Sequence, residues 1–249
     1  MRKTSRLLAI VLLTLAATGV VAEAQNARPQ FRPAVLGSGP DSLINRIDAD
    51  ALIKAGQKDG AVMFCSLVNK SGAAVQSRTY RAMPGTAALE EEVRRRLADA
   101  KFAPAIYNHQ PVDVMLSGTV IFSASGKPRV RIFLNQDPIE LKAAADFIAP
   151  QPVFGSDSGF TGLDYPDEVP VPVSAVVDLR LNVDISGRLL EMRVIAEEPP
   201  LLGFAEIAQR DFGPAKFIPA FRDGEATDSN AVYPVAYQPA DWAASLEAQ

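Results

Sequence analysis

The sequence AKFIPA at residues 215–220 has a near copy, AKFAPA, at residues 100–105. The two stretches lie 115 positions apart, and the similarity continues on both sides of them. Between residues 60–122 and 175–237, 15 of 63 aligned positions are identical without a gap, where composition alone would give about four. We therefore expect one supersecondary unit to occur twice in this chain.

The composition is that of a globular protein. Of 249 residues, 48% are hydrophobic and 22% are charged, and the formal net charge is −4. This length accommodates two small domains. An acidic chain without a basic cluster argues against nucleic acid or anionic lipid as a partner, because both require clustered positive charge.

The first 24 residues have the features of an export signal. Three basic residues among the first six precede an apolar run at residues 7–21, and AEA at residues 22–24 provides a cleavage site between Ala24 and Gln25. The alternative is an uncleaved membrane anchor, but the 15-residue run is shorter than the roughly 20 residues that span a bilayer. Cleavage removes three basic residues and one acidic residue, which changes the net charge from −4 to −6.

The second copy shows the unit most clearly. Residues 177–183 alternate between apolar and polar side chains, which predicts a strand with one buried face. Ser186 and Gly187 form the following turn, and residues 190–194 return as a second strand. A helix at residues 204–212 and a strand at Val232 to Tyr237 complete the order hairpin, helix, strand.

The first copy follows the same plan with an addition. Its helix carries three acidic residues four positions before three arginines, at Glu90–Glu92 and Arg94–Arg96, which predicts a solvated helix face. Its opening strand is apolar on both faces, because Met63, Cys65 and Leu67 replace polar residues of the second copy, so something must cover the second face. The added segment is a candidate cover: a strand at residues 129–134 and a helix at residues 138–148.

These patterns predict an α+β protein with two tandem small domains, each an antiparallel β-hairpin–helix–strand sheet. The predicted segments are a signal peptide (1–24), an irregular lead-in with a short helix (25–58), the first repeat with its added strand and helix (59–149), a Pro/Gly linker (150–172), the second repeat (173–238) and a tail (239–249).

The shared motif resembles the C-terminal domain of TonB, the periplasmic energy transducer. The resemblance covers both repeats, about half of the chain. It rests on a Ser-Gly turn followed at a fixed distance by a basic-Phe-x-Pro-Ala exit from the helix, and on Tyr165-Pro166 ahead of the second copy. The residues of the motif are Ser71, Gly72, Phe102 and Pro104 in the first repeat and Ser186, Gly187, Phe217 and Pro219 in the second. We expect the two phenylalanines to pin the helix exit to the sheet.

The resemblance implies a binding mode. In that family a three-stranded sheet packs on a helix, and its last strand pairs with an extended peptide of an outer-membrane transporter. In the first repeat the added strand at residues 129–134 would fill that position. In the second repeat the last strand would remain an edge, with Pro234 removing one backbone donor. The predicted binding residues are therefore Val232, Tyr233, Val235 and Tyr237.

The sequence does not favour an enzyme. His109 is the single histidine and Cys65 the single cysteine, so no His–Cys or His–carboxylate motif is available for catalysis. Asp164, Asp167 and Glu168 lack the spacing of a calcium loop. We expect no metal and no cofactor.

The sequence therefore predicts a non-enzymatic periplasmic binding or adaptor protein of the cell envelope, whose partner is an extended peptide of an envelope or outer-membrane protein. Two alternatives remain open. One is a purely structural tandem-domain envelope protein whose sheet edges are all internally paired. The other is a membrane-anchored TonB-like energy transducer, which takes part in transmembrane transport and requires that residues 1–24 are not cleaved.

Overall fold

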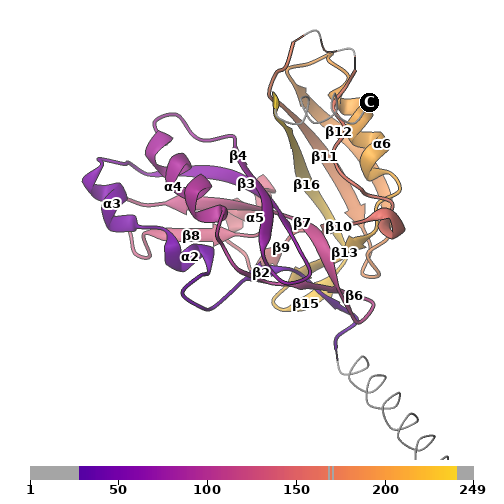
Figure 1. Ribbon diagram of the computed structural model, residues 1–249, viewed down its shortest axis with the longest axis horizontal. Coiled ribbons are helices and arrows are strands. Elements are labelled where there is room, and N and C mark those ends of the chain that lie inside the picture. The colour runs from indigo at the N-terminus through magenta and orange to yellow at the C-terminus, as the bar shows by residue number, and fades with distance from the viewer. Residues whose placement is uncertain (1–27, 168, 170, 240–249) are drawn as a thin grey trace, which may run out of the picture.

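The computed structural model describes residues 28–167, 169 and 171–239 (Figure 1). The fold is mixed α+β, and every strand pairing among these residues is antiparallel. Figure 1 shows the first repeat on the left and the second at the upper right. The predicted signal peptide, with its cleavage site at Ala24 and Gln25, and all of the tail except Pro239 lie outside the described residues.

The two repeats contain the predicted elements in the predicted order. The first comprises β3 (Gly60–Val68), β4 (Ala74–Tyr80), α4 (Ala87–Leu97), β5 (Phe102–Ala103), β6 (Ala105–Tyr107) and β7 (Gln110–Phe122). The second comprises β11 (Ala175–Val183), β12 (Leu189–Glu198), α6 (Phe204–Phe212), β13 (Phe217–Ile218), β14 (Ala220–Arg222), β15 (Glu225–Thr227) and β16 (Ser229–Tyr237).

The strand register repeats with the sequence. In the first repeat β3 pairs with β7 from Gly60 opposite Phe122 to Val68 opposite Val114. In the second repeat β11 pairs with β16 from Ala175 opposite Tyr237 to Val183 opposite Ser229. Each of these four end residues of the first repeat lies 115 positions before its counterpart in the second, the same offset that separates the sequence copies. The prediction of one unit used twice is confirmed.

The Ser-Gly turn and the Phe-x-Pro exit belong to one arrangement. The N–H of Phe217 donates to the carbonyl oxygen of Gly187 at 3.0 Å, so the exit from α6 lies directly on the hairpin turn. A Cβ on Gly187 would lie 2.0 Å from the carbonyl oxygen of Phe217, and Gly187 has φ +77°. Gly72 and Phe102 repeat this geometry, with 2.1 Å and φ +82°. The turn needs glycine because another backbone crosses it there.

Each repeat encloses its own core between helix and sheet. Leu89, Val93 and Leu97 of α4 are fully buried, and Phe102 lies in the same core. The second core is aromatic, with Phe160, Tyr165, Phe204, Phe212, Phe217, Tyr233 and Tyr237 in contact. Phe102 and Phe217 therefore lie where the sequence places them, between the helix exit and the sheet.

One acidic residue of α4 is not on a solvated face. Glu92 is buried, and its carboxylate accepts hydrogen bonds from the N–H of Asp48, from Arg96 at 2.8 Å and from Arg95. Arg94 pairs with Glu91 instead of Glu90. The prediction of three exposed pairs is wrong at Glu92, because the lead-in segment covers this side of the helix and needs an acceptor for its backbone.

The lead-in is more regular than predicted. It contains β1 (Phe31–Arg32), β2 (Val35–Leu36), α2 (Leu43–Arg46) and α3 (Ala49–Lys54). β1 pairs with β6 and β2 pairs with β5. The sequence predicts a single short helix here, whereas the structure has two, and the strands depend on partners about 70 residues away that no local pattern reveals.

The added segment of the first repeat is confirmed in part. β8 (Val130–Phe133) pairs with β7, as the short connection predicts. The helix α5 (Pro138–Ala143) is shorter than the expected 138–148, because Ala144 adopts a left-handed conformation that ends it. β9 (Phe147–Ile148) follows and pairs with β14 of the second repeat. Because residues 147–148 pair with β14, they cannot also continue the helix.

The predicted linker contains a strand that joins the repeats. β10 (Gln151–Phe154) pairs with β7 on one side and with β13 on the other, and a 3₁₀ turn, η1 (Ser156–Ser158), follows. The buried Gln151 side chain also exchanges two hydrogen bonds with the backbone of Ala34. Describing residues 150–172 as a linker only is therefore wrong for residues 151–158, whose short apolar strand lies among proline and glycine signals.

No helix among the described residues is long and apolar enough to cross a membrane.

Candidate binding edge

The predicted binding strand lies at the edge of its sheet but is not accessible. β16 ends the order β12-β11-β16, as the sequence predicts. Tyr233, Val235 and Tyr237 are buried, and only Val232 is partly exposed. β16 lies on the side of the second sheet that faces the first repeat (Figure 1). The first repeat therefore occupies the position that a peptide would need.

Side chains of the first repeat and its added segment bond the outward backbone groups of β16. The N–H of Val232 donates to the Asp137 carboxylate at 2.8 Å. The carbonyl oxygen of Ala236 accepts from Arg78 at 3.1 Å, and that of Pro234 accepts from the Tyr80 hydroxyl at 3.4 Å. The prediction of a peptide-accessible edge at Val232, Tyr233, Val235 and Tyr237 is thus contradicted. Sequence reasoning missed these bonds because the partners lie about 95 to 160 positions away.

The second face of β3 finds its cover in the same interface. Cys65 and Tyr80 are buried against Ala236, with Met63 and Val176 at the margin of this cluster. The second repeat, and not the added segment alone, covers the apolar face. Burial raises the pKa of the Tyr80 hydroxyl well above its ordinary value, and burial also raises the pKa of Tyr233.

An ion pair crosses the same interface. The guanidinium of Arg81 donates to both carboxylate oxygens of Asp178, at 2.6 and 3.0 Å, and both side chains are mostly buried. A two-point pair of this kind fixes both distance and orientation. The repeats are therefore held in one arrangement, and the masking of β16 is a built feature of the fold.

The opposite edge of the second sheet has no partner strand in the described part of the chain. Among the described residues β12 pairs with β11 alone, and Figure 1 shows it on the far side of β11 from β16. Two β-bulges interrupt its register, at Leu190 and at Ile195. Both side chains are about half exposed, at 52% and 48%. Four of the eight large hydrophobic residues that are exposed in the described chain fall between positions 185 and 201, namely Ile185, Leu190, Ile195 and Leu201.

The ladder geometry identifies which backbone groups of β12 face outward. Val232 lies opposite Arg180 of β11, and its N–H points away from β11 to Asp137. Arg180 therefore directs its backbone groups to β12, where Arg193 is opposite. Because successive residues alternate, Met192 and Val194 turn their N–H and C=O groups away from β11. No other described residue bonds these groups.

Charged side chains lie on the outer face of this free strand. Glu191 and Arg193 lie opposite Asn182 and Arg180, on the sheet face away from α6. The two side chains form an exposed ion pair at 2.6 Å. Met192 and Val194 instead pack against the core on the α6 face.

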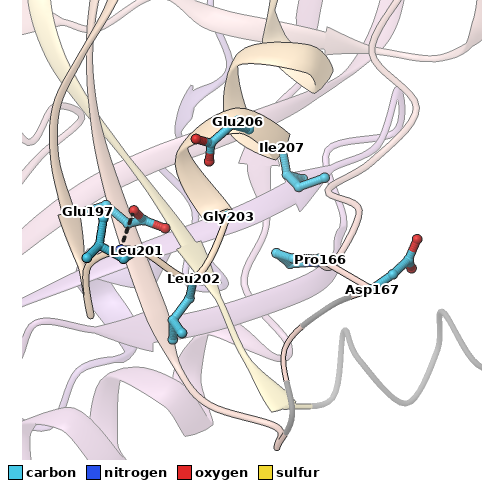
Figure 2. Close-up of a pocket in the computed structure, with 8 residues that line it drawn as sticks. All are labelled: Pro166, Asp167, Glu197, Leu201, Leu202, Gly203, Glu206 and Ile207. Atoms are coloured by element: carbon cyan, nitrogen blue, oxygen red, sulfur yellow. Dashed lines mark hydrogen bonds between the residues drawn. The ribbon is translucent and has the colours of Figure 1, made fainter.

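A cavity of about 640 Å³ lies beyond the end of β12, at the start of α6 (Figure 2). One group in its wall, the Glu197 carboxylate, accepts the N–H of Leu201 at 3.0 Å and the N–H of Phe204 at 2.8 Å. This carboxylate therefore caps α6 and fixes the loop that presents Leu201. The lining residues are Pro166, Asp167, Glu197, Leu201, Leu202, Gly203, Glu206 and Ile207.

The residues considered for chemistry have structural surroundings. His109 lies in the turn between β6 and β7, with its Nδ1 2.7 Å from the carbonyl oxygen of Arg28. Cys65 is buried in the interface and forms no disulfide within the described part of the chain. Asp164 pairs with Arg210. In the described part of the chain, no three His, Cys, Asp or Glu side chains come together as a metal site.

Comparisons with family models, with curated proteins and with solved structures find no match, so the relation to TonB stays a resemblance that rests on the motif residues.

Proposed function

We propose that this protein is a non-enzymatic binding or adaptor protein of the periplasm, built as a tandem pair of TonB C-terminal-like domains. It recognises an extended segment of an envelope protein by pairing with a free sheet edge. The single observation that carries the proposal is the edge of β12, which pairs with no strand other than β11 among residues 28–167, 169 and 171–239 and is bordered by exposed Leu190 and Ile195. An exposed edge with apolar side chains is a template for a partner strand.

The binding edge differs from the one that the resemblance implies. In the family the last strand of the domain receives the peptide, but here the last strand, β16, is masked by the first repeat. The hairpin strand β12 lies at the other edge of the same sheet. Binding thus stays in the second repeat and moves to its outer side.

Backbone amide shifts on titration with a short extended peptide test this function. The probe is the uncharged peptide TVTVTVT, added to isotopically labelled protein. We expect the largest shifts at Met192 and Val194, whose amides face outward, and small shifts in β16. A control peptide with N-methyl groups on the backbone face that meets β12 should not bind, because methylation removes the donors of the new ladder. Shifts centred on residues 229–237, or none anywhere, would contradict the proposal.

The structural alternative also has an observation in its favour. Both sides of β7 are paired, and β16 is bonded to side chains along its outer side. In a purely structural protein β12 would bind no partner, and the peptide titration would leave the chemical shifts of its amides unchanged.

Localisation is tested separately, by mass spectrometry of the exported protein. We expect a mature chain that begins at Gln25 in the periplasmic fraction. A chain that retains Met1 and fractionates with the membrane would favour the anchored energy transducer instead.

A further inference from the structure

The free edge of β12 is regular over only a short stretch. Between its two bulges, residues 191–194 keep an uninterrupted register with β11, from Glu191 opposite Asn182 to Val194 opposite Leu179. Bulges end strand pairing, because the extra residue breaks the ladder. A partner strand can therefore pair regularly with the four residues 191–194 of β12, which favours specific over extended association.

Side chains along this stretch alternate in a defined way. Met192 and Val194 are apolar and pack on the α6 face, whereas Glu191 and Arg193 carry opposite charges on the other face of the sheet. Leu190, at the bulge that begins the stretch, is apolar and half exposed. In an antiparallel pair, residues directly opposite each other have their side chains in contact, and opposite charges there are favourable. A strand that pairs with this stretch should place a base opposite Glu191 and an acid opposite Arg193.

We propose that β12 selects an antiparallel partner segment with the pattern apolar–acidic–apolar–basic–apolar, read from its N-terminus. The inference rests on the proposed function and specifies its ligand. The central apolar residue lies opposite Met192, with which it exchanges two backbone hydrogen bonds. Its charged residues form cross-strand pairs with Arg193 and Glu191. Its first apolar residue lies opposite Val194, and its last apolar residue lies beyond the regular register, next to the exposed Leu190 at the bulge.

Antiparallel pairing is favoured on two grounds. Antiparallel ladders are slightly more stable per residue than parallel ones, and all strand pairs among the described residues are antiparallel. In a parallel partner the order of the two charges would be reversed. The order of the two charges in the peptide that binds more tightly therefore also reports the orientation of the partner strand, and one set of peptides tests both.

The equivalent strand of the first repeat lacks this pattern. β4 is also an edge strand, and Val75 occupies the bulge position that corresponds to Leu190, with the same exposure of 52%. The residues that follow, Gln76 and Ser77, are uncharged, and Arg78 is bonded to Ala236. The charge pair exists in the second repeat alone, so selectivity should reside there.

Two charged peptides test the charge order on the intact protein. TVEVRVT carries the proposed pattern and TVRVEVT carries the reverse. We expect TVEVRVT to bind about tenfold more tightly, which corresponds to about 1.4 kcal/mol. A nitroxide at the N-terminus of TVEVRVT should broaden the amide of Ala196 more than that of Leu189, because an antiparallel peptide begins at the C-terminal end of β12.

A charge-swapped protein provides the matched control. In the double variant Glu191→Arg, Arg193→Glu, the ion pair is kept in reverse order at two exposed positions, so the fold should persist with an unchanged amide spectrum away from β12. The preference between the two peptides should invert by about the same factor. A swap that leaves the preference unchanged would overturn the proposal.

The peptide titrations distinguish a wrong charge pattern from a wrong proposed function. If TVTVTVT and both charged peptides bind at β12 equally well, strand addition stands and the charge pattern is wrong. If none binds, the proposed function fails as well. Residues 190–194 themselves have the proposed pattern, so a second copy is the competing occupant. A dimer in sedimentation that protects the amides of Met192 and Val194 would overturn the partner-segment proposal in favour of self-association.

Discussion

At Gly187 and Gly72 a hydrogen stands in place of a side chain because a crossing backbone leaves no room. The carbonyl oxygens of Phe217 and Phe102 would lie 2.0 and 2.1 Å from the missing Cβ atoms. The sequence predicts the positive φ of both turns from the Ser-Gly pattern. It does not predict the crossing, because nothing local shows that the helix exit returns to the turn 30 residues earlier.

Replacing Gly187 with alanine, beside a control glycine in the same conformation, measures how much the crossing backbone contributes to stability beyond the positive φ. Gly187→Ala should lower the free energy of unfolding by about 3 kcal/mol, the sum of left-handed strain and a clash with backbone. Gly224→Ala is the control, because Gly224 has φ +83° and open space around it, and it should cost about 1 kcal/mol. Urea denaturation measures both. Equal losses would show that the crossing does not constrain the turn.

At the scale of elements, α4 and β16 show where sequence patterns stop being informative. The apolar stripe of α4 identifies its buried face correctly, with Leu89, Val93 and Leu97 in the core. The acidic run gives no sign that Glu92 is buried, since its backbone partner, Asp48, belongs to another element. The strand β16 is likewise predicted from its alternation, whereas its masking depends on side chains from the first repeat and its added segment.

Glu92 gives α4 an acid-sensitive contribution to stability. Burial alone raises the pKa of Glu92, but hydrogen bonds from the Asp48 N–H, Arg96 and Arg95 outweigh it, so its pKa lies below its ordinary value of 4.5. A lowered pKa adds stability above about pH 4.5, and that stability is lost as the pH falls through the folded-state pKa. Glu92→Gln should therefore cost about 2 kcal/mol at pH 7.

The pH dependence distinguishes this role from simple packing. The difference in unfolding free energy between Glu92→Gln and the parent protein should shrink as the pH is lowered from 5 to about 3. Glu91→Gln is the control, because the Glu91–Arg94 pair is exposed, and it should change stability by less than about 0.5 kcal/mol. A Glu92→Gln penalty that is the same at pH 3 and pH 7 would show that the charge is not responsible.

On the scale of the whole molecule, the two repeats form one body. Strand β10 pairs with both, β9 pairs with β14, and Arg81 bonds Asp178 across the interface. Hydrophobic periodicity and the 115-residue offset identify the two units and their internal order. They do not identify how the units meet, because strands of two to four residues in a proline-rich stretch carry too little pattern to predict.

A double-mutant cycle measures how strongly the interface couples the repeats. Arg81→Met and Asp178→Asn should show a coupling free energy of about 1 kcal/mol in urea denaturation, because the pair is two-point and mostly buried. The exposed pair Arg94–Glu91 is the reference and should give less than about 0.5 kcal/mol. Coupling as small as that of the reference pair would mean that the repeats are not held by this contact.

Native-state amide hydrogen exchange tests the central claim, that the second sheet has a masked edge at β16 and a free edge at β12. The amides of Met192 and Val194 should exchange within about minutes, while those of Glu191 and Arg193, which face β11, should persist for about hours. The amide of Val232 should also persist, because it is bonded to the buried Asp137. The claim is contradicted if the amides of Met192 and Val194 are as protected as that of Arg193. It is also contradicted if the amide of Val232 exchanges as fast as those of Met192 and Val194.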